Sequence, residues 1–154
     1  MTRATLAIAL LVLVAGCAPQ IRGDVTYDPN ALYRNYQTVA WVEGQGVGSS
    51  EVRAITEKGV RTELEKDNLR FVEDRAQADL LVRINLGRHK RTKMSGMAGA
   101  ATQKVGLDVI LIDRKSGDWV WHGWATETWE SELDPQTEVT KALAHMFEDF
   151  PPTK

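Results

Sequence analysis

The spacing of apolar residues changes several times along the chain, and each spacing predicts a different kind of element. Alternation of β-branched or aromatic residues with polar ones predicts strands. Two other segments repeat apolar residues every three or four positions, which predicts helices with one apolar stripe. The predicted strands cover residues 38–43, 69–73, 79–93, 104–113 and 119–129, after a short extended piece at 24–29, and the predicted helices cover about 51–66 and a segment that begins at 134–135.

The ends of the two predicted helices carry residues that commonly start or stop helices. Ser49 or Ser50 can cap the first helix, because a serine oxygen accepts hydrogen bonds from the free N–H groups of a first turn. Asn68 follows the apolar stripe of this helix and is the expected stop. Asp134 caps the second helix, whose stripe runs on until two prolines, residues 151–152, stop it.

This order of elements predicts an α+β fold in two layers. Four predicted strands follow one another without an intervening helix, so we expect hairpins and a mostly antiparallel sheet of about five strands. Each helix has a single apolar stripe, and such a helix buries its stripe against a neighbouring layer. Both helices are therefore expected to pack on one face of the sheet, as a two-layer sandwich.

The N-terminal residues have a different pattern, because an unbroken apolar run follows a single basic residue, Arg3. The run is too short to span a membrane, and it predicts a secretory signal peptide over residues 1–16. It ends in VAGC at residues 14–17, which resembles the lipobox of bacterial lipoproteins. We therefore expect cleavage before Cys17, whose thiol would carry a diacylglycerol thioether, with palmitate-like chains that hold the protein on a membrane.

The residues after the cysteine predict where the domain sits. In Gram-negative bacteria an aspartate directly after the lipidated cysteine favours retention in the inner membrane, whereas this chain has Ala18. We therefore expect a position on the outer membrane, facing the periplasm. Residues 17–23, the lipidated cysteine and its tether, reach only about 20 Å when extended. The remaining residues, 24–154, are expected to form a single periplasmic domain close to the bilayer.

Composition agrees with a single core and argues against a nucleic-acid partner. Loss of residues 1–16 from a chain of 154 leaves 138 residues, which suits one domain. The whole chain has 19 lysines and arginines against 21 acidic residues, so loss of Arg3 leaves a formal charge of −3. Such a balance is not that of a dedicated nucleic-acid binder. With its one cysteine lipidated, the domain has no disulfide and depends on packing.

Groups that could carry catalysis are scattered. The histidines lie on three different predicted elements, without the spacing of metal ligands or of a nucleophile and its base: His89, His122 and His145. Acidic residues at 127, 130, 132 and 134 surround Trp129 and could be read as the carboxylate pair of a glycosidase. The simpler interpretation is a strand end that leads into a helix N-terminus, where acidic residues are favoured. We therefore expect no catalytic residue, no metal and no cofactor.

Tryptophans gather on the last predicted strand, at positions 119, 121, 124 and 129. Strict alternation places Trp119 and Trp121 on one face of the strand, and His122 and Trp124 on the other. At least one of these faces should belong to the core beneath the helices. His122 and Trp124 are a candidate surface on which a ligand could stack, unless they lie on a partly covered second face.

The segment from residue 88 to residue 93 is the most basic surface feature. Positive charge at a strand end often serves only to prevent edge-to-edge pairing. Alternatively, Arg88, Lys90, Arg91 and Lys93 contact anionic lipid or another envelope component, and each charge near an anionic membrane adds roughly 1 kcal/mol. The short tether brings a membrane within reach of this segment.

Several short segments, taken in order, resemble a known family. They are VTYD at 25–28, TVAW at 38–41, ADLLV at 78–82, LID at 111–113, WHGWA at 121–125 and FPP at 150–152. Together they are similar to the bacterial lipoprotein family called domain of unknown function 4136. The resemblance implies a single α+β domain on a lipid anchor, facing the periplasm, with no assigned catalytic residues. The chain differs from the family pattern at residues 67–68, where a glycine usually ends the first helix, and in the basic segment.

Two functions are compatible with these observations. The one that we favour is a lipid-anchored lipoprotein of the cell envelope that works without catalysis, as an accessory or binding module for an unidentified ligand. The alternative is an enzyme that acts on cell-wall or sugar substrates through the carboxylates near Trp129. The absence of a clustered catalytic constellation in the sequence favours the first function.

Overall fold

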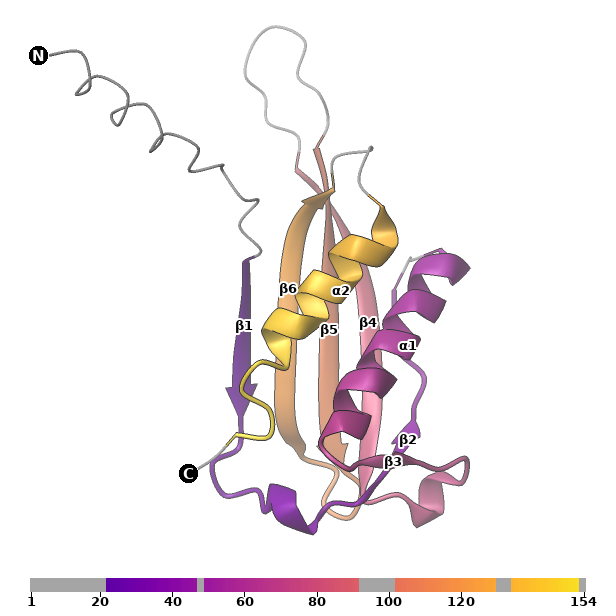
Figure 1. The fold of residues 1–154 in the computed structure, drawn as a ribbon, viewed down its shortest axis with the longest axis vertical. Helices are drawn as coiled ribbons and strands as arrows, with labels where there is room; N and C mark the ends of the chain where they lie inside the picture. Colours follow the sequence, from indigo (N-terminus) through magenta and orange to yellow (C-terminus); the bar gives the residue numbers. More distant parts are fainter. Residues whose placement is uncertain (1–21, 47–48, 92–101, 130–133, 153–154) are drawn as a thin grey trace, which may run out of the picture.

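The computed structural model describes residues 22–46, 49–91, 102–129 and 134–152, in which two helices pack on one face of a six-stranded sheet (Figure 1). The strands are β1 (Arg22–Tyr27), β2 (Thr38–Trp41), β3 (Arg70–Phe71), β4 (Leu80–Arg91), β5 (Thr102–Asp113) and β6 (Trp119–Trp129). The helices are α1 (Ser50–Lys66) and α2 (Pro135–Met146), and the 3-10 turns are η1 (Tyr33–Asn35) and η2 (Arg75–Gln77). The predicted α+β sandwich is confirmed.

The sheet has the order β1-β6-β5-β4-β2-β3. The first four of these strands pair with one another in antiparallel fashion, whereas β2 is parallel to both β4 and β3. The sequence predicts about five strands, and the structure has six. The additional strand is β1, because the predicted extended piece at 24–29 begins earlier and pairs with β6 from residue 22 to residue 27.

Alternate residues of the central strands supply the core beneath the helices. They are Val82, Ile84 and Leu86 from β4, Leu107, Val109 and Leu111 from β5, and Trp121 and Ala125 from β6, all buried. The helices cover them with apolar stripes that include Val60 and Leu64 of α1 and Leu143 and Met146 of α2. The two helices approach closely at Gly59, where an added Cβ would lie 2.3 Å from Cδ1 of Leu143.

Capping residues begin both helices as predicted. The Ser49 hydroxyl accepts a hydrogen bond from the N–H of Val52 at 3.2 Å, and Asp134 caps α2. Asn68 follows α1 in the left-handed conformation, with φ of 64°. The prediction that the second helix continues to residues 151–152 is wrong, since α2 ends at Met146.

Helix α2 ends before the prolines at 151–152 because the aromatic residues that follow it pack into the core. The Phe147 ring stacks on Trp121 with centroids 4.7 Å apart. Phe150 lies edge-on to Trp121 at 5.6 Å and to Tyr33 at 6.0 Å. A helix continued through Phe150 would carry its ring along the helix axis instead of into this cluster.

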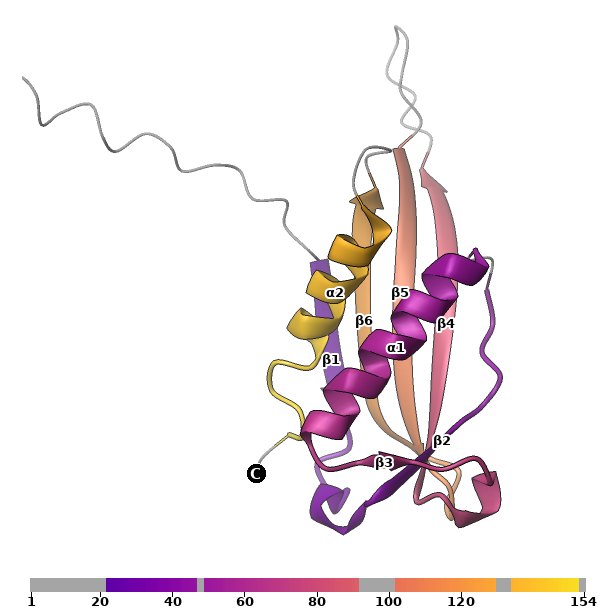
Figure 2. The same ribbon diagram turned by 45° about the vertical axis from the view of Figure 1, so that its right-hand side comes forward.

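The antiparallel pairing defines two ends of the sheet. β1 begins where β6 ends, since Arg22 pairs with Thr126, and β4 ends where β5 begins, since Arg91 pairs with Thr102. We call this the proximal end, because the chain enters the domain here. The opposite, distal end holds the β1–β2 connection, the end of α1 and the β5–β6 turn (Figures 1 and 2).

Candidate functional site

The basic segment belongs to the proximal end. The backbone of Arg88, Lys90 and Arg91 continues β4 and pairs with β5. Lys93 lies outside the described residues, and so does Cys17. Since β1 also begins at this end, the chain enters the described domain at the end of the sheet to which the basic segment belongs. None of the helices in the described ranges is long and apolar enough to cross a bilayer.

Among the carboxylates near Trp129, Asp134 has a structural task. Its carboxylate accepts hydrogen bonds from the N–H groups of Gln136 at 3.3 Å and Thr137 at 3.2 Å, which cap α2. Glu130 and Glu132 lie outside the described residues, and the structure describes residue 127 as backbone of β6. Within the described part of the chain, no three His, Cys, Asp or Glu residues are grouped to hold a metal ion.

His122 and Trp124 lie on the face of the sheet opposite the helices, and both are partly exposed. Trp119 lies on this face as well, which corrects the prediction that it shares a face with Trp121. The reason is an irregularity in the pairing of β5 and β6, because Leu111 pairs with Trp121 but Ile112 pairs with Trp119. This bulge adds one residue to β6 and reverses the alternation before it. The Trp119 ring is 57% exposed and lies 5.8 Å from the His122 ring.

Polar groups border these aromatic rings. Nε2 of His122 lies 3.7 Å from Oδ1 of Asp108 on β5, too far for a hydrogen bond. Nε of Arg83 on β4 is buried, and it has no hydrogen-bond partner among the described residues. Ile110, which pairs with both Arg83 and His122, is only 4% exposed. This face therefore combines a mostly covered apolar centre with aromatic and charged groups around it.

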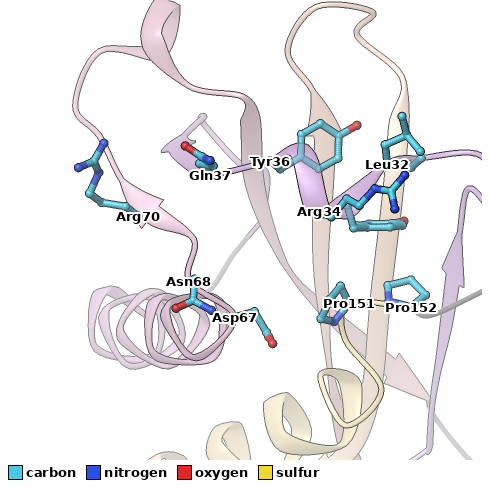
Figure 3. A pocket seen from close by; sticks show the side chains of 11 residues that line it. Leu32, Arg34, Tyr36, Gln37, Asp67, Asn68, Arg70, Pro151 and Pro152 are labelled. Carbon is cyan, nitrogen blue, oxygen red and sulfur yellow. The ribbon is translucent and has the colours of Figure 1, made fainter.

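A pocket of about 910 Å³, which the sequence did not predict, opens at the distal end (Figure 3). Its walls come from the β1–β2 connection with η1, the end of α1, the start of β3 and the last described residues. The lining residues are Ala31, Leu32, Tyr33, Arg34, Tyr36, Gln37, Asp67, Asn68, Arg70, Pro151 and Pro152.

Two tyrosines form a fixed wall of this pocket. The Tyr36 hydroxyl donates to Oδ2 of Asp113 at 2.9 Å, and the Tyr33 hydroxyl donates to the carbonyl oxygen of Val120. Burial, followed by the nearby charge of Asp28, raises the pKa of Tyr33 to about 12. Burial and the hydrogen bond to Asp113 also raise the pKa of Tyr36. Both hydroxyls therefore stay protonated and bound to the protein, so the rings remain in place.

The segment that carries Tyr36 is held by a second carboxylate. Oδ2 of Asp79 accepts hydrogen bonds from the N–H groups of Gln37 at 2.9 Å and Thr38 at 3.1 Å, and from the Thr38 hydroxyl at 2.9 Å. Partial burial alone would raise the pKa of Asp79, but these hydrogen bonds to the ionised form outweigh it and lower the pKa. The backbone beside Gln37 is thus fixed by a charged group.

The rim of the pocket carries polar side chains that have no partner among the described residues. Within the described part of the chain, the side chains of Arg34, Gln37, Asn68 and Arg70 make no hydrogen bond and no ion pair. Figure 3 shows Arg34 and Arg70 on opposite sides of the pocket, with Asp67 and Asn68 at the end of α1. Burial, and then the charge of Glu63, raises the pKa of Asp67. The lining therefore offers more positive than negative charge.

Local sequence patterns miss this pocket, because its lining comes from segments that lie far apart in the chain. The signals that could have pointed to it are the FPP sequence at 150–152 and the non-glycine residue at the end of α1. Each of these signals marks a helix end just as well, so neither one alone indicates a cavity.

Three solved bacterial structures share this fold. A DUF4136 family protein from Bacteroides thetaiotaomicron is 11% identical, with a TM-score of 0.64 over 85% of this chain and 96% of its own. A PDZ domain protein from Parabacteroides distasonis is 16% identical, with a TM-score of 0.63 over 88% of this chain, which spans only 38% of that longer protein. The PelC dodecamer from Paraburkholderia phytofirmans is 16% identical, with a TM-score of 0.57 over 88% of this chain and all of PelC.

At such low identities these likenesses show a common fold alone. In sequence, the chain matches no curated protein. The model of the family described as "Domain of unknown function (DUF4136)" matches residues 24–152, which is nearly the whole predicted domain. The chain therefore belongs to the DUF4136 family, as its ordered segments indicate.

Proposed function

We propose that this protein is a lipid-anchored lipoprotein of the bacterial cell envelope that acts without catalysis, as a binding module. The observation that carries the proposal is the division of the sheet into two ends. The chain enters the described domain at the proximal end, to which the basic segment also belongs, and the pocket opens at the distal end. The lipobox-like VAGC sequence at residues 14–17 supports attachment through Cys17.

The dimensions of the domain support one orientation at the membrane. The twelve residues of β5 separate the two ends by roughly 40 Å, at about 3.3 Å per residue. Because Arg22 and Gly23 belong to β1, only residues 17–21 remain for the tether, and at about 3.3 Å per residue they reach roughly 17 Å, which keeps the proximal end near the bilayer. In this orientation the basic segment approaches the lipid headgroups, and the distal pocket faces the periplasm.

Fractionation of cells tests the anchor and its address. We expect the wild-type protein in the outer membrane, Cys17→Ser in the soluble fraction or in the inner membrane with an uncleaved signal, and Ala18→Asp in the inner membrane. Cys17→Ser should keep the thermal midpoint of the wild type, because the described core contains no cysteine. A Cys17→Ser protein that remains in the outer membrane would contradict the proposal.

Photo-crosslinking in cells tests the orientation. A crosslinking side chain at Lys90, on the proximal end, is expected to capture lipid, whereas one at Gln37, on the rim of the distal pocket, is not. A third position, Trp119, reports whether the face opposite the helices meets a partner. Equal capture of lipid by the crosslinking residues at Lys90 and at Gln37 would show that the proximal end does not face the membrane.

A further inference from the structure

We infer that the distal pocket binds an acidic saccharide, with separate carboxylates of the saccharide bound by Arg34 and by Arg70 and a sugar ring packed against the tyrosine and proline walls. The inference rests on the proposed function in one respect, since it identifies the ligand class of the proposed binding module. The chemistry of the lining carries the rest.

The pocket has the size and the rigidity of a small-molecule site. Its volume of about 910 Å³ lies within the range of roughly 300–1,000 Å³ that such sites occupy. Tyr33 and Tyr36 are held by hydrogen bonds to Val120 and Asp113. Pro151 follows Phe150, whose ring is packed against Tyr33. Little side-chain freedom would therefore be lost in these walls when a ligand binds.

The charge of the lining residues favours the binding of an anionic ligand. Arg34 and Arg70 lie on opposite sides of the pocket, and neither pairs with a carboxylate among the described residues (Figure 3). Among the described lining residues, Asp67 is the one acidic residue, against these two guanidinium groups. A guanidinium binds a planar carboxylate through two parallel hydrogen bonds, which makes a carboxylate a well-matched anion here.

The neutral polar groups favour a ligand that also carries hydroxyls. Gln37 and Asn68 each present an amide that can both donate and accept, and neither amide has a partner in the described part of the chain. The Asp67 carboxyl is a further acceptor. Both amides are exposed and hydrated in the free protein, and an aliphatic acid would displace this water without replacing its hydrogen bonds, which lowers affinity. Sugar hydroxyls would replace these hydrogen bonds.

The apolar lining suits a ring. Tyrosine rings and prolines present flat faces with little conformational freedom, against which the C–H face of a pyranose can pack. Leu32 and Ala31 add smaller apolar surfaces to the lining. Ring packing, hydroxyl recognition and carboxylate binding are thus available in one pocket, and an acidic saccharide is the ligand class that uses all three.

Asn68 offers a test that separates binding from folding. Its φ of 64° is a conformation that glycine adopts without steric cost, so Asn68→Gly removes the amide from the pocket and retains the helix end. Arg34→Gln and Arg70→Gln remove the charges from two exposed side chains that make no contact required by the fold. Lys58→Gln, on the exposed side of α1, is the matched control.

The experiment is isothermal titration of the lipidated protein in detergent with trigalacturonic acid, with neutral maltotriose, and with a tripeptide that has a free C-terminal carboxylate. We expect trigalacturonic acid to bind, and maltotriose and the tripeptide to bind at least about tenfold more weakly. Arg34→Gln and Arg70→Gln should each weaken trigalacturonate binding about tenfold, and Asn68→Gly severalfold, with thermal midpoints unchanged. Lys58→Gln should bind as the wild type does.

Tighter binding of maltotriose or of the tripeptide would overturn the inference, as would failure of trigalacturonic acid to bind. Binding that the arginine variants leave unchanged would place the site elsewhere and overturn it as well. The outcomes are independent of the proposed location, because fractionation of Cys17→Ser does not depend on the pocket. A failed titration thus leaves the anchor intact, and a failed fractionation leaves the ligand class intact.

Discussion

The two ends of the sheet are built by different kinds of interaction. At the distal end the Tyr33 hydroxyl reaches the carbonyl of Val120, and that of Tyr36 reaches Asp113, so residues from opposite halves of the chain meet. At the proximal end, β4 and β5 pair as a hairpin of consecutive strands, and the predicted anchor is a short motif at residues 14–17. The pocket therefore depends on the whole fold, whereas the proposed attachment depends on local sequence.

The largest expected effect tests whether the distal end depends on the core. Trp121 is 1% exposed and stacks on Phe147, so Trp121→Ala should lower the free energy of unfolding by about 3–5 kcal/mol. Trp119→Ala, on the opposite face, should cost less than about 1 kcal/mol, because this ring is largely exposed. Urea denaturation measures both variants. Equal losses would show that the bulge does not separate the two faces.

The next largest expected effect is a loss of membrane binding by the proximal end. In a soluble Cys17→Ser protein without the signal peptide, reversal of Arg88, Lys90, Arg91 and Lys93 to Glu should weaken binding to anionic vesicles, with roughly 1 kcal/mol lost per original charge. Sedimentation with anionic and neutral vesicles measures this effect.

A reversal of three positive charges at the distal end controls for most of the change in net charge. Arg34, Arg70 and Lys115 changed together to Glu should alter vesicle binding much less, since these residues lie at the end away from the tether. The idea of a membrane-facing proximal end fails if the two sets of reversals weaken vesicle binding alike.

A smaller expected effect is the pH dependence of the stability that carboxylates at the distal end contribute. The pKa values of Asp79 and Asp113 are lowered in the folded protein, so their hydrogen bonds contribute stability above the unfolded pKa of about 3.9, and this contribution is lost as pH falls through the folded values. Asp79→Asn should therefore cost about 1–3 kcal/mol at pH 7 and distinctly less at pH 3. Urea denaturation at both pH values checks this, with Asp118→Asn as a neutral control. A cost that is the same at both pH values would contradict the assignment.

The smallest effect compares the two ends of α1. Ser49→Ala removes the hydroxyl that caps the helix near the proximal end, and it should lower stability by about 1 kcal/mol. Asn68→Gly, at the distal end of the same helix, should leave stability unchanged or slightly increased, because glycine suits its positive φ. Thermal denaturation of both variants measures the difference. A larger loss for Asn68→Gly would mean that its amide supports the fold and is not free for a ligand.

Much of the fold follows from local patterns. The predicted strand at 119–129 coincides with β6, and Ser49 and Asp134 cap the helices as predicted. These features depend on residues within a few positions of one another, so periodicity and capping chemistry are sufficient to predict them. The candidate surface at His122 and Trp124 was placed on the correct side of β6 for the same reason, although no observation tests its function.

Other features lay beyond any local pattern. Trp119 changes face because of a bulge that depends on how β6 pairs with β5, and alternation within one strand carries no information about the partner strand. α2 ends before residues 151–152 because Phe150 packs against Tyr33, far away in the chain.

The sequence by itself thus determined the elements, the family and the predicted anchor at Cys17, because each depends on neighbouring residues or on their order along the chain. Long-range pairing and packing place the start of β1 and the basic segment at one end of the sheet and open a pocket at the other. A pocket lined by Arg34, Asp67 and Pro151 exists only when three separate segments meet, and long-range packing alone brings them together.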